Sequence, residues 1–232
     1  MKSSGKVKSV LTGKAVSFAH GSKSAIDKKV VDGRQSVSFL GLNGDEQGDL
    51  RFHGGVEKAL HIYPTEHYNQ WVEELGERDV FRHIGAFGEN ISSVGVTEED
   101  MCLGDIVRIG STLLEVSQGR MPCWKLNVRF DQNDMAKRLQ DSLRTGWYFR
   151  VLQEGDIGQG DDIILCDRPY PEWSLARIMS VIFEGCLETS ELQKLAQLPL
   201  VESWKKLVDR RISDGVVEDW SPRIEGPCDK DK

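Results

Sequence analysis

The feature that most restricts the fold of this chain is a series of short β-strands, separated by glycine turns, over its first 165 or so residues. Apolar side chains alternate imperfectly over residues 6–18, and strand-like runs follow at residues 25–31, 36–42, 58–63, 105–109, 112–117, 147–153 and 162–166. Asp32-Gly33 and Gly110-Ser111 suit tight turns, so residues 25–42 and 105–117 are each predicted to form a hairpin. Many short strands with few intervening helices favour a closed or nearly closed barrel over a doubly wound parallel sheet.

Helical patterns occur in two parts of the chain. Residues 64–75, with Pro64 at a first-turn position, and residues 133–143 are predicted helices among the strands. After two prolines in residues 168–171 the chain becomes helical, at residues 173–183, from residue 189, and at residues 203–212. The predicted fold is thus mainly β with α: a barrel domain over residues 1–168, then a small C-terminal three-helix segment and polar tail over residues 169–232. Three short helices bury little surface alone, so we expect them to pack on the barrel, with Lys205-Lys206 and Arg210-Arg211 in solvent.

The composition excludes several classes of function. Among 232 residues, 30 Lys and Arg against 37 Asp and Glu give a net charge of −7, which argues against general nucleic-acid binding. No apolar run approaches the roughly 20 residues that cross a bilayer, and the start lacks the apolar centre of a secretory signal. We therefore expect a cytoplasmic protein with no membrane partner. The five cysteines form no CxxC pair, so a zinc site of the usual spacing is not predicted.

The most suggestive stretch for chemistry is SQGRMPCWKLN at residues 117–127. Cys123 follows a proline just beyond a predicted strand, between Arg120 and Lys125. Nearby positive charge favours the thiolate, which is both a nucleophile and a soft metal ligand. The alternative is an inert buried cysteine whose cationic neighbours face solvent, and on the residues alone the two interpretations have equal weight.

Three further stretches are candidates for binding an anion or a ring. Five glycines among charged residues occupy positions 41–58, including Gly54 and Gly55 after His53, with Arg51 and Lys58 as sources of charge. An ordinary surface loop is the alternative, although loops of this length are more often functional or disordered. Lys23, in the turn at residues 21–24, and Asn90, in residues 87–92, are each better explained as solvated or turn residues when taken alone.

In this order the motifs resemble the MOSC family (molybdenum cofactor sulfurase C-terminal domain), and within it the YiiM-like subgroup. The resemblance covers nearly the whole chain, through GSKSAI at 21–26, LGLNGDEQ at 40–47, HGGVEKAL at 53–60, YPTEHY at 63–68, AFGENI at 86–91, GDI at 104–106 and VSQGRMPCWKLN at 116–127. It implies a twisted, mostly β barrel that binds a pterin-based molybdenum cofactor (molybdopterin with Mo). Gly119, Trp124 and Val56 depart from the expected pattern.

The resemblance also implies roles for individual residues. Cys123 is the expected metal ligand, and a soft, polarisable sulfur suits a metal that changes oxidation state. The expected cofactor-binding residues are Lys23, Arg51, His53, Gly54, Gly55, Asn90, Arg120 and Cys123, of which Cys123 and His53 are the expected catalytic residues.

The implied activity is the reduction of N-hydroxylated compounds such as 6-N-hydroxylaminopurine, a toxic base analogue: R–NHOH with two electrons and two protons gives R–NH2 and water. His53 is the first candidate for the proton source, with Asp45 and Glu46 as alternatives. No iron–sulfur or flavin signature is present, so the electron donor is expected to be a separate flavoprotein reductase or ferredoxin. Two other functions stay open: a cofactor carrier or sulfur-transfer protein, and a binding module whose C-terminal helices dock a partner.

Overall fold

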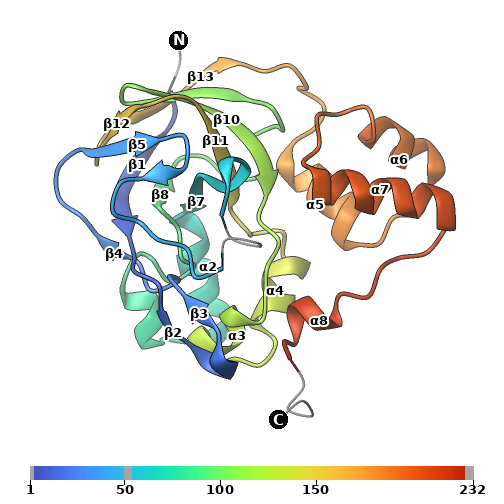
Figure 1. Cartoon of the computed structure of the whole chain (residues 1–232), viewed down its shortest axis with the longest axis horizontal. Coiled ribbons are helices and arrows are strands. Elements are labelled where there is room, and N and C mark those ends of the chain that lie inside the picture. Colours follow the sequence, from blue (N-terminus) through green and yellow to red (C-terminus); the bar gives the residue numbers. More distant parts are fainter. Residues whose placement is uncertain (1–2, 50–53, 228–232) are drawn as a thin grey trace.

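The computed structural model describes residues 3–49 and 54–227, and a closed β-barrel is its central feature (Figure 1). Its seven strands, within the described residues, are β1 (Ser3–Thr12), β7 (Leu60–Pro64), β8 (Ile91–Val94), β9 (Ile106–Ile109), β10 (Thr112–Gly119), β11 (Trp147–Gln153) and β13 (Asp162–Asp167). Around the barrel the order is β1-β13-β9-β10-β11-β7-β8 and back to β1. All neighbours are antiparallel except β7 and β8, which run parallel. The predicted barrel is confirmed.

The remaining short strands of the described residues lie outside the seven strands of the barrel. They are β2 (Val16–Ser17), β3 (Lys23–Ser24), β4 (Lys29–Val30), β5 (Gln35–Ser38), β6 (Gly41–Leu42) and β12 (Gly155–Ile157). The hairpin predicted at residues 105–117 is confirmed by the pairing of β9 with β10. The hairpin predicted at residues 25–42 is wrong, because β4 pairs with the end of β1 whereas β5 pairs with β6 and β12. Partners distant in sequence thus override the local turn signal at Asp32-Gly33.

Helices lie below and beside the barrel in Figure 1. They are η1 (Ala19–Gly21), η2 (Val56–Lys58), α2 (Glu66–Leu75), η3 (Asp79–Arg82), α3 (Lys125–Phe130), α4 (Met135–Asp141), α5 (Leu175–Phe183), α6 (Thr189–Leu195), α7 (Glu202–Asp214) and α8 (Ser221–Ile224). The predicted first-turn role of Pro64 is wrong, since Pro64 ends β7 and Thr65 is the N-cap of α2. No helix in the described ranges has the length and apolar character needed to span a bilayer.

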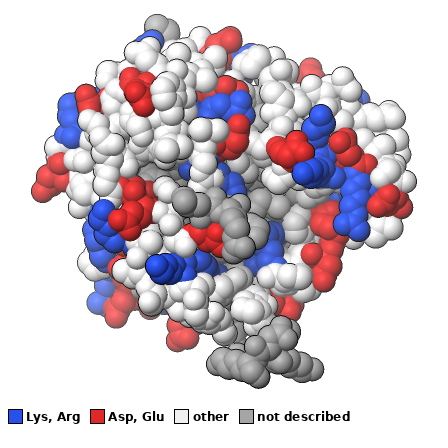
Figure 2. All heavy atoms as spheres, in the orientation of Figure 1, with Lys and Arg blue, Asp and Glu red and all other residues white. Residues whose placement is uncertain are grey.

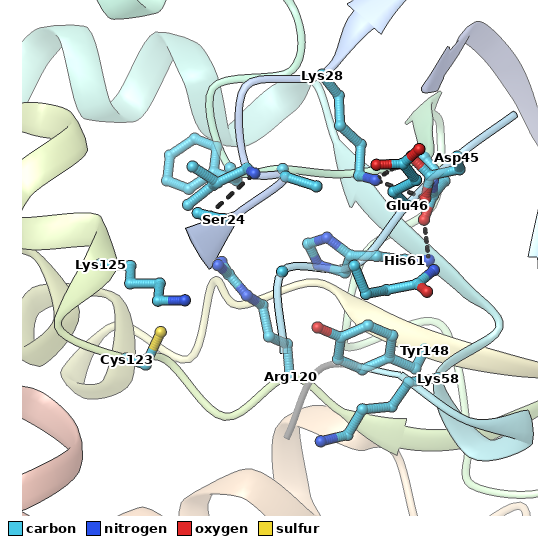
Figure 3. A pocket seen from close by; sticks show the side chains of 17 residues that line it. Ser24, Lys28, Asp45, Glu46, Lys58, His61, Arg120, Cys123, Lys125 and Tyr148 are labelled. Atoms are coloured by element: carbon cyan, nitrogen blue, oxygen red, sulfur yellow. Dashed lines mark hydrogen bonds and ion pairs between the residues drawn. The ribbon is translucent and has the colours of Figure 1, made fainter. Parts of the chain in front are cut away.

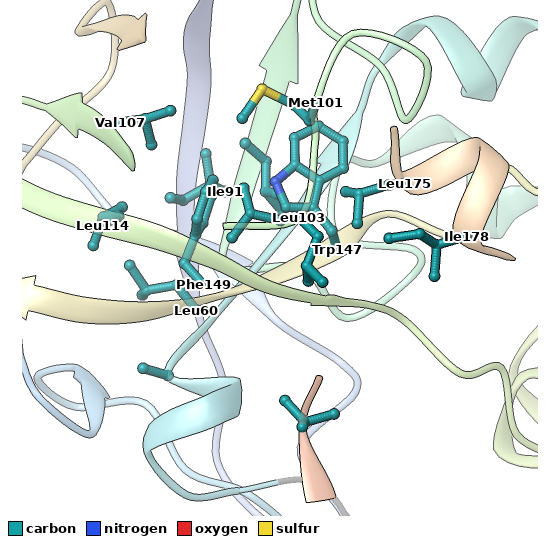
Figure 4. Packing of buried hydrophobic residues seen from close by; sticks show 14 of the residues in the cluster. Leu60, Ile91, Met101, Leu103, Val107, Leu114, Trp147, Phe149, Leu175 and Ile178 are labelled. Carbon is teal, nitrogen blue, oxygen red and sulfur yellow. The ribbon is translucent and has the colours of Figure 1, made fainter. Parts of the chain in front are cut away.

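One apolar core joins the barrel to the C-terminal helices. Trp147 and Leu103 from the barrel pack with Leu175 and Ile178 from α5 (Figure 4), and Trp204 of α7 belongs to the same cluster. At the contact, a Cβ on Gly119 would lie 2.4 Å from the sulfur of Met179, so a larger residue there would require the Met179 side chain to move. A second cluster of mainly aromatic residues fills the space between α2, α3 and α4. The C-terminal helices therefore pack on the barrel.

The prediction that Arg211 faces solvent is wrong. Its side chain is fully buried, and its guanidinium donates to Glu218 at 2.5 Å and to the carbonyl oxygen of Ile182 at 2.7 Å. Arg210, next to it in sequence, is 70% exposed in its side chain. A buried cation is tolerated here because hydrogen bonds and an opposite charge replace its lost hydration.

Candidate functional site

A hollow opens where β10 leaves the barrel, beside the ends of β7 and β11. Its lining includes Arg120, Cys123 and Asn90 from the predicted set, together with Lys28, Asp45, Lys58, His61, Lys125 and Tyr148 (Figure 3). Lys23, Gly54 and Gly55 are described but do not line it: Lys23 is exposed, and Gly55 is the N-cap of η2. The candidates Arg51 and His53 lie outside the described residues. Figure 2 shows acidic and basic side chains interspersed over this face, with several Lys and Arg toward its centre.

Strand alternation positions two aromatic side chains on the wall of this pocket. Leu60 and Ile62 of β7, like Trp147 and Phe149 of β11, point into the barrel core. The intervening His61 and Tyr148 are register partners, and their ring centroids lie 5.0 Å apart. The period of two in these strands predicts that both side chains leave the core. That signal was present in the sequence and was missed.

The electrostatics of this wall keep both rings uncharged at neutral pH. Burial, and then the positive charge of Arg120, hold the pKa of His61 well below its usual value. Burial raises the pKa of Tyr148, although Arg120 opposes that shift. Arg120 is therefore the fixed charge of this wall, next to two neutral rings that can donate or accept a hydrogen bond.

A buried ion pair forms another wall of the pocket. Lys28 Nζ donates to both carboxylate oxygens of Asp45, at 2.5 and 2.6 Å, and the two side chains are 7% and 3% exposed. Asp45 also accepts hydrogen bonds from the amide nitrogen of Asn90 at 2.8 Å and from the backbone N–H of Gly13 at 2.8 Å. Burial lowers the pKa of Lys28, and the attraction of Asp45 opposes this shift.

Asn90 ties three parts of the chain together behind this ion pair. Its amide nitrogen donates to the carbonyl oxygen of Leu11 at 3.3 Å as well as to Asp45, and its carbonyl oxygen accepts from the N–H of His61 at 3.1 Å. The side chain predicted to contact a ring edge is thus engaged in holding β1, β7 and Asp45 together. The neighbouring Glu89, fully buried, accepts from Tyr68 and from the N–H groups of Gly85 and Phe87, which fixes the loop before β8.

Cys123 lies between β10 and α3 and is partly exposed. Burial lowers the pKa of Lys58, and a negative charge on Cys123 opposes that shift; Arg223 of α8 responds in the same way. The cations coupled to this thiol therefore come from η2 and α8. Lys125, the sequence neighbour expected to play that part, donates its Nζ to the carbonyl oxygen of Lys23 at 2.6 Å.

The pocket offers a donor set that fits a metal-bearing anionic cofactor. Nη1 of Arg120, on the pocket wall, is a buried polar atom without a hydrogen-bond partner among the described residues. Such atoms cost free energy unless a ligand or water satisfies them. Together with the soft sulfur of Cys123 and the ammonium groups of Lys58 and Lys125, this arrangement suits a phosphate-bearing, metal-carrying ligand. Over the described ranges, no group of three or more His, Cys, Asp or Glu side chains is placed to hold a metal ion by itself.

The structure is a closed barrel with a thiol and a cationic pocket at one end. Comparisons with known proteins identify the family to which it belongs. The MOSC domain model matches residues 49–164, and the model of the YiiM-like 3-alpha helix domain matches residues 173–215. Protein YiiM of Escherichia coli (strain K12) is 36% identical over 218 residues, covering 94% of this chain and 97% of the relative. The chain belongs to the MOSC family, in its YiiM-like group.

Two further similarities bear on fold and function. The crystal structure of YiiM from Escherichia coli superposes with a TM-score of 0.79 at 31% identity, covering 97% of this chain and 100% of that structure. A protein of Gibberella moniliformis (strain M3125 / FGSC 7600) named "Reductase" is 39% identical over 191 residues, which is 82% of this chain and 34% of that protein. The family and this relative suggest an oxidoreductase, and the MOSC family is associated with the molybdenum cofactor.

Proposed function

We propose that this protein is a molybdenum-cofactor-dependent reductase that converts N-hydroxylated compounds, R–NHOH, into amines, R–NH2. One observation carries the proposal: a thiol, Cys123, opens on a pocket whose wall holds the buried, unpartnered Nη1 of Arg120. The likeness to a reductase supports it from a separate direction. Small substrates such as 6-N-hydroxylaminopurine are the proposed class, and loss of their hydroxyl oxygen consumes two electrons and two protons.

Different residues of the pocket would bind different parts of the cofactor. Cys123 would be the protein ligand of molybdenum, and Arg120, Lys58 and Lys125 would neutralise the phosphate of the pterin. When bound, the cofactor supplies a two-electron centre that accepts oxygen. The electrons are proposed to come from a separate flavoprotein reductase or ferredoxin.

The pocket wall also offers a source of protons. Asp45 receives hydrogen bonds from Lys28, Asn90 and Gly13, so this carboxylate acts as an acceptor. Lys28 Nζ carries the proton of that pair, and its lowered pKa makes it a stronger acid than an exposed lysine. Among the described residues we therefore assign proton donation to Lys28, while His53, the first candidate from the sequence, lies outside them.

The decisive experiment measures molybdenum and pterin in protein made in a host that synthesises the cofactor. Wild type, Cys123→Ala and the control Cys166→Ala, whose cysteine is exposed on β13, are compared by elemental analysis and by pterin fluorescence after oxidation. We expect near-stoichiometric molybdenum in wild type and in the control, and at least a tenfold loss in Cys123→Ala, because the metal loses its protein ligand.

The loaded protein is then assayed for reduction of 6-N-hydroxylaminopurine with a chemical reductant as electron source. Turnover by wild type and none by Cys123→Ala would support the reductase. Molybdenum that exchanges freely without turnover, or pterin retained without metal, would favour a cofactor carrier instead. Protein with neither metal nor pterin would overturn the proposal.

A further inference from the structure

A short segment near the C-terminus forms hydrogen bonds with the loop that carries Cys123. Helix α8 lies beside α3 and α4 in Figure 1, apart from the three helices that pack on the barrel. The carbonyl oxygen of Arg223 accepts a hydrogen bond from the N–H of Trp124 at 2.8 Å, and that of Ile224 accepts from the side-chain amide of Asn127 at 2.9 Å. These bonds join α8 to two residues on the C-terminal side of Cys123.

The Arg223 side chain reaches the other side of the same cysteine. Its Nη1 donates to the carbonyl oxygen of Pro122, and its Nη2 donates to Oε1 of Gln140, on α4, at 2.5 Å. Arg223 therefore contacts the residue before Cys123 through its side chain and the residue after it through its backbone. A single residue holds both neighbours of the thiol.

The environment of Arg223 keeps its guanidinium in place. The guanidinium lies 4.4 Å from the centre of the Trp220 ring and 6.0 Å from that of Phe183. Burial lowers the pKa of Arg223 to about 10, while the negative charges of Cys123 and Glu218 oppose the shift. The side chain is thus charged at neutral pH and packed between aromatic rings, which restricts the positions it can take.

We propose that Arg223 is a positioning residue of the Cys123 site, which holds the loop so that the thiol faces the pocket. Both family models end before α8, the later one at residue 215. The C-terminal segment thereby supports the loop that brings Cys123 to the pocket, in addition to packing on the barrel. The part of this inference that concerns metal binding rests on the proposed function.

The first test needs no cofactor: amide hydrogen exchange in wild type, Arg223→Ala, Arg223→Lys and Arg210→Ala. Arg210 is the matched control, because it is an exposed arginine on α7 that forms a surface ion pair with Asp214. In Arg223→Ala we expect the amide of Trp124 to exchange at least tenfold faster, since α8 no longer anchors its partner carbonyl. The amide of Val116, in the middle of β10, should be unchanged, and Arg223→Lys should restore part of the protection.

The second test measures the fraction of molybdenum that remains after prolonged dialysis, and kcat and KM of the loaded protein. We expect several-fold less metal in Arg223→Ala, partial rescue by Arg223→Lys, and a fall in kcat at nearly constant KM. Unchanged exchange at Trp124, or equal acceleration at Val116 and Trp124, would overturn the positioning role. Wild type without molybdenum would overturn the proposed function alone, because the exchange result stands independently of the metal.

Discussion

His61 is a buried histidine that Arg120 and its own desolvation keep neutral, so its pKa in the folded chain lies well below that in the unfolded chain. As the pH falls from 7 to 5, the unfolded chain takes up this proton first, and the free energy of unfolding must decrease. We expect a loss of up to about 1.4 kcal/mol per pH unit within that window. Urea denaturation at both pH values should show a shallower decrease for His61→Gln than for wild type.

The control for this prediction is His83→Gln, because His83 is exposed. Its pH dependence should match that of wild type. A pH dependence in His61→Gln as steep as in wild type would contradict the assignment of the effect to His61.

At the scale of single residues, the contacts that can be predicted from the sequence are those between residues on the same strand or loop. Cys123 and Arg120 are three positions apart and do line one pocket. Lys28 and Asp45 are 17 positions apart, and Asn90, which donates to the same carboxylate, lies 45 positions after Asp45. Arg223 lies 100 residues after Cys123, and nothing in its local sequence shows that it reaches the Cys123 loop.

Among the elements, the junction between α5 and α7 depends most on one side chain. Arg211→Met would remove the buried cation that pairs with Glu218 and that also donates to the carbonyl oxygens of Val181 and Ile182. We expect the free energy of unfolding to fall by about 3–5 kcal/mol, measured by urea denaturation. Arg210→Met, one position away and exposed, should change it by less than about 0.5 kcal/mol. Equal effects of the two substitutions would show that the buried contacts of Arg211 contribute no stability.

Elements with a strong local pattern were predicted, and those stabilised by distant partners were not. The strands β9 and β11 and the first half of β10 alternate in burial, and all three agree with prediction within a residue or two. Strand β8 has the sequence Ile-Ser-Ser-Val, a weak signal, and becomes a strand because β1 and β7 pair with it from both sides. The same reasoning explains why β4 leaves the predicted hairpin.

At the scale of the whole molecule, the barrel and the C-terminal helices share one core and should unfold together. Ile178, fully buried on α5, packs in the cluster that contains Trp147 and Leu103 of the barrel. We expect Ile178→Ala to lower the free energy of unfolding by about 2–5 kcal/mol while tryptophan fluorescence and far-ultraviolet circular dichroism still report one coincident transition. Leu187→Ala, at a residue that is 42% exposed, is the control with a small effect. An earlier, separate melting of the helices would contradict a shared core.

The closure of the barrel between β1 and β13 has a consequence for the newly made chain. Ser3 pairs with Ile164, so β1 cannot complete its pairing until β13, near the end of the barrel sequence, has been synthesised. Until then one edge of β1 and the free edge of β9 present unpaired backbone groups, which are templates for association between chains. Contacts so distant in sequence also slow folding. We therefore expect the growing chain to depend on chaperones more than the finished protein does, and aggregation during synthesis to increase most in variants that weaken the pairing of β1 with β13.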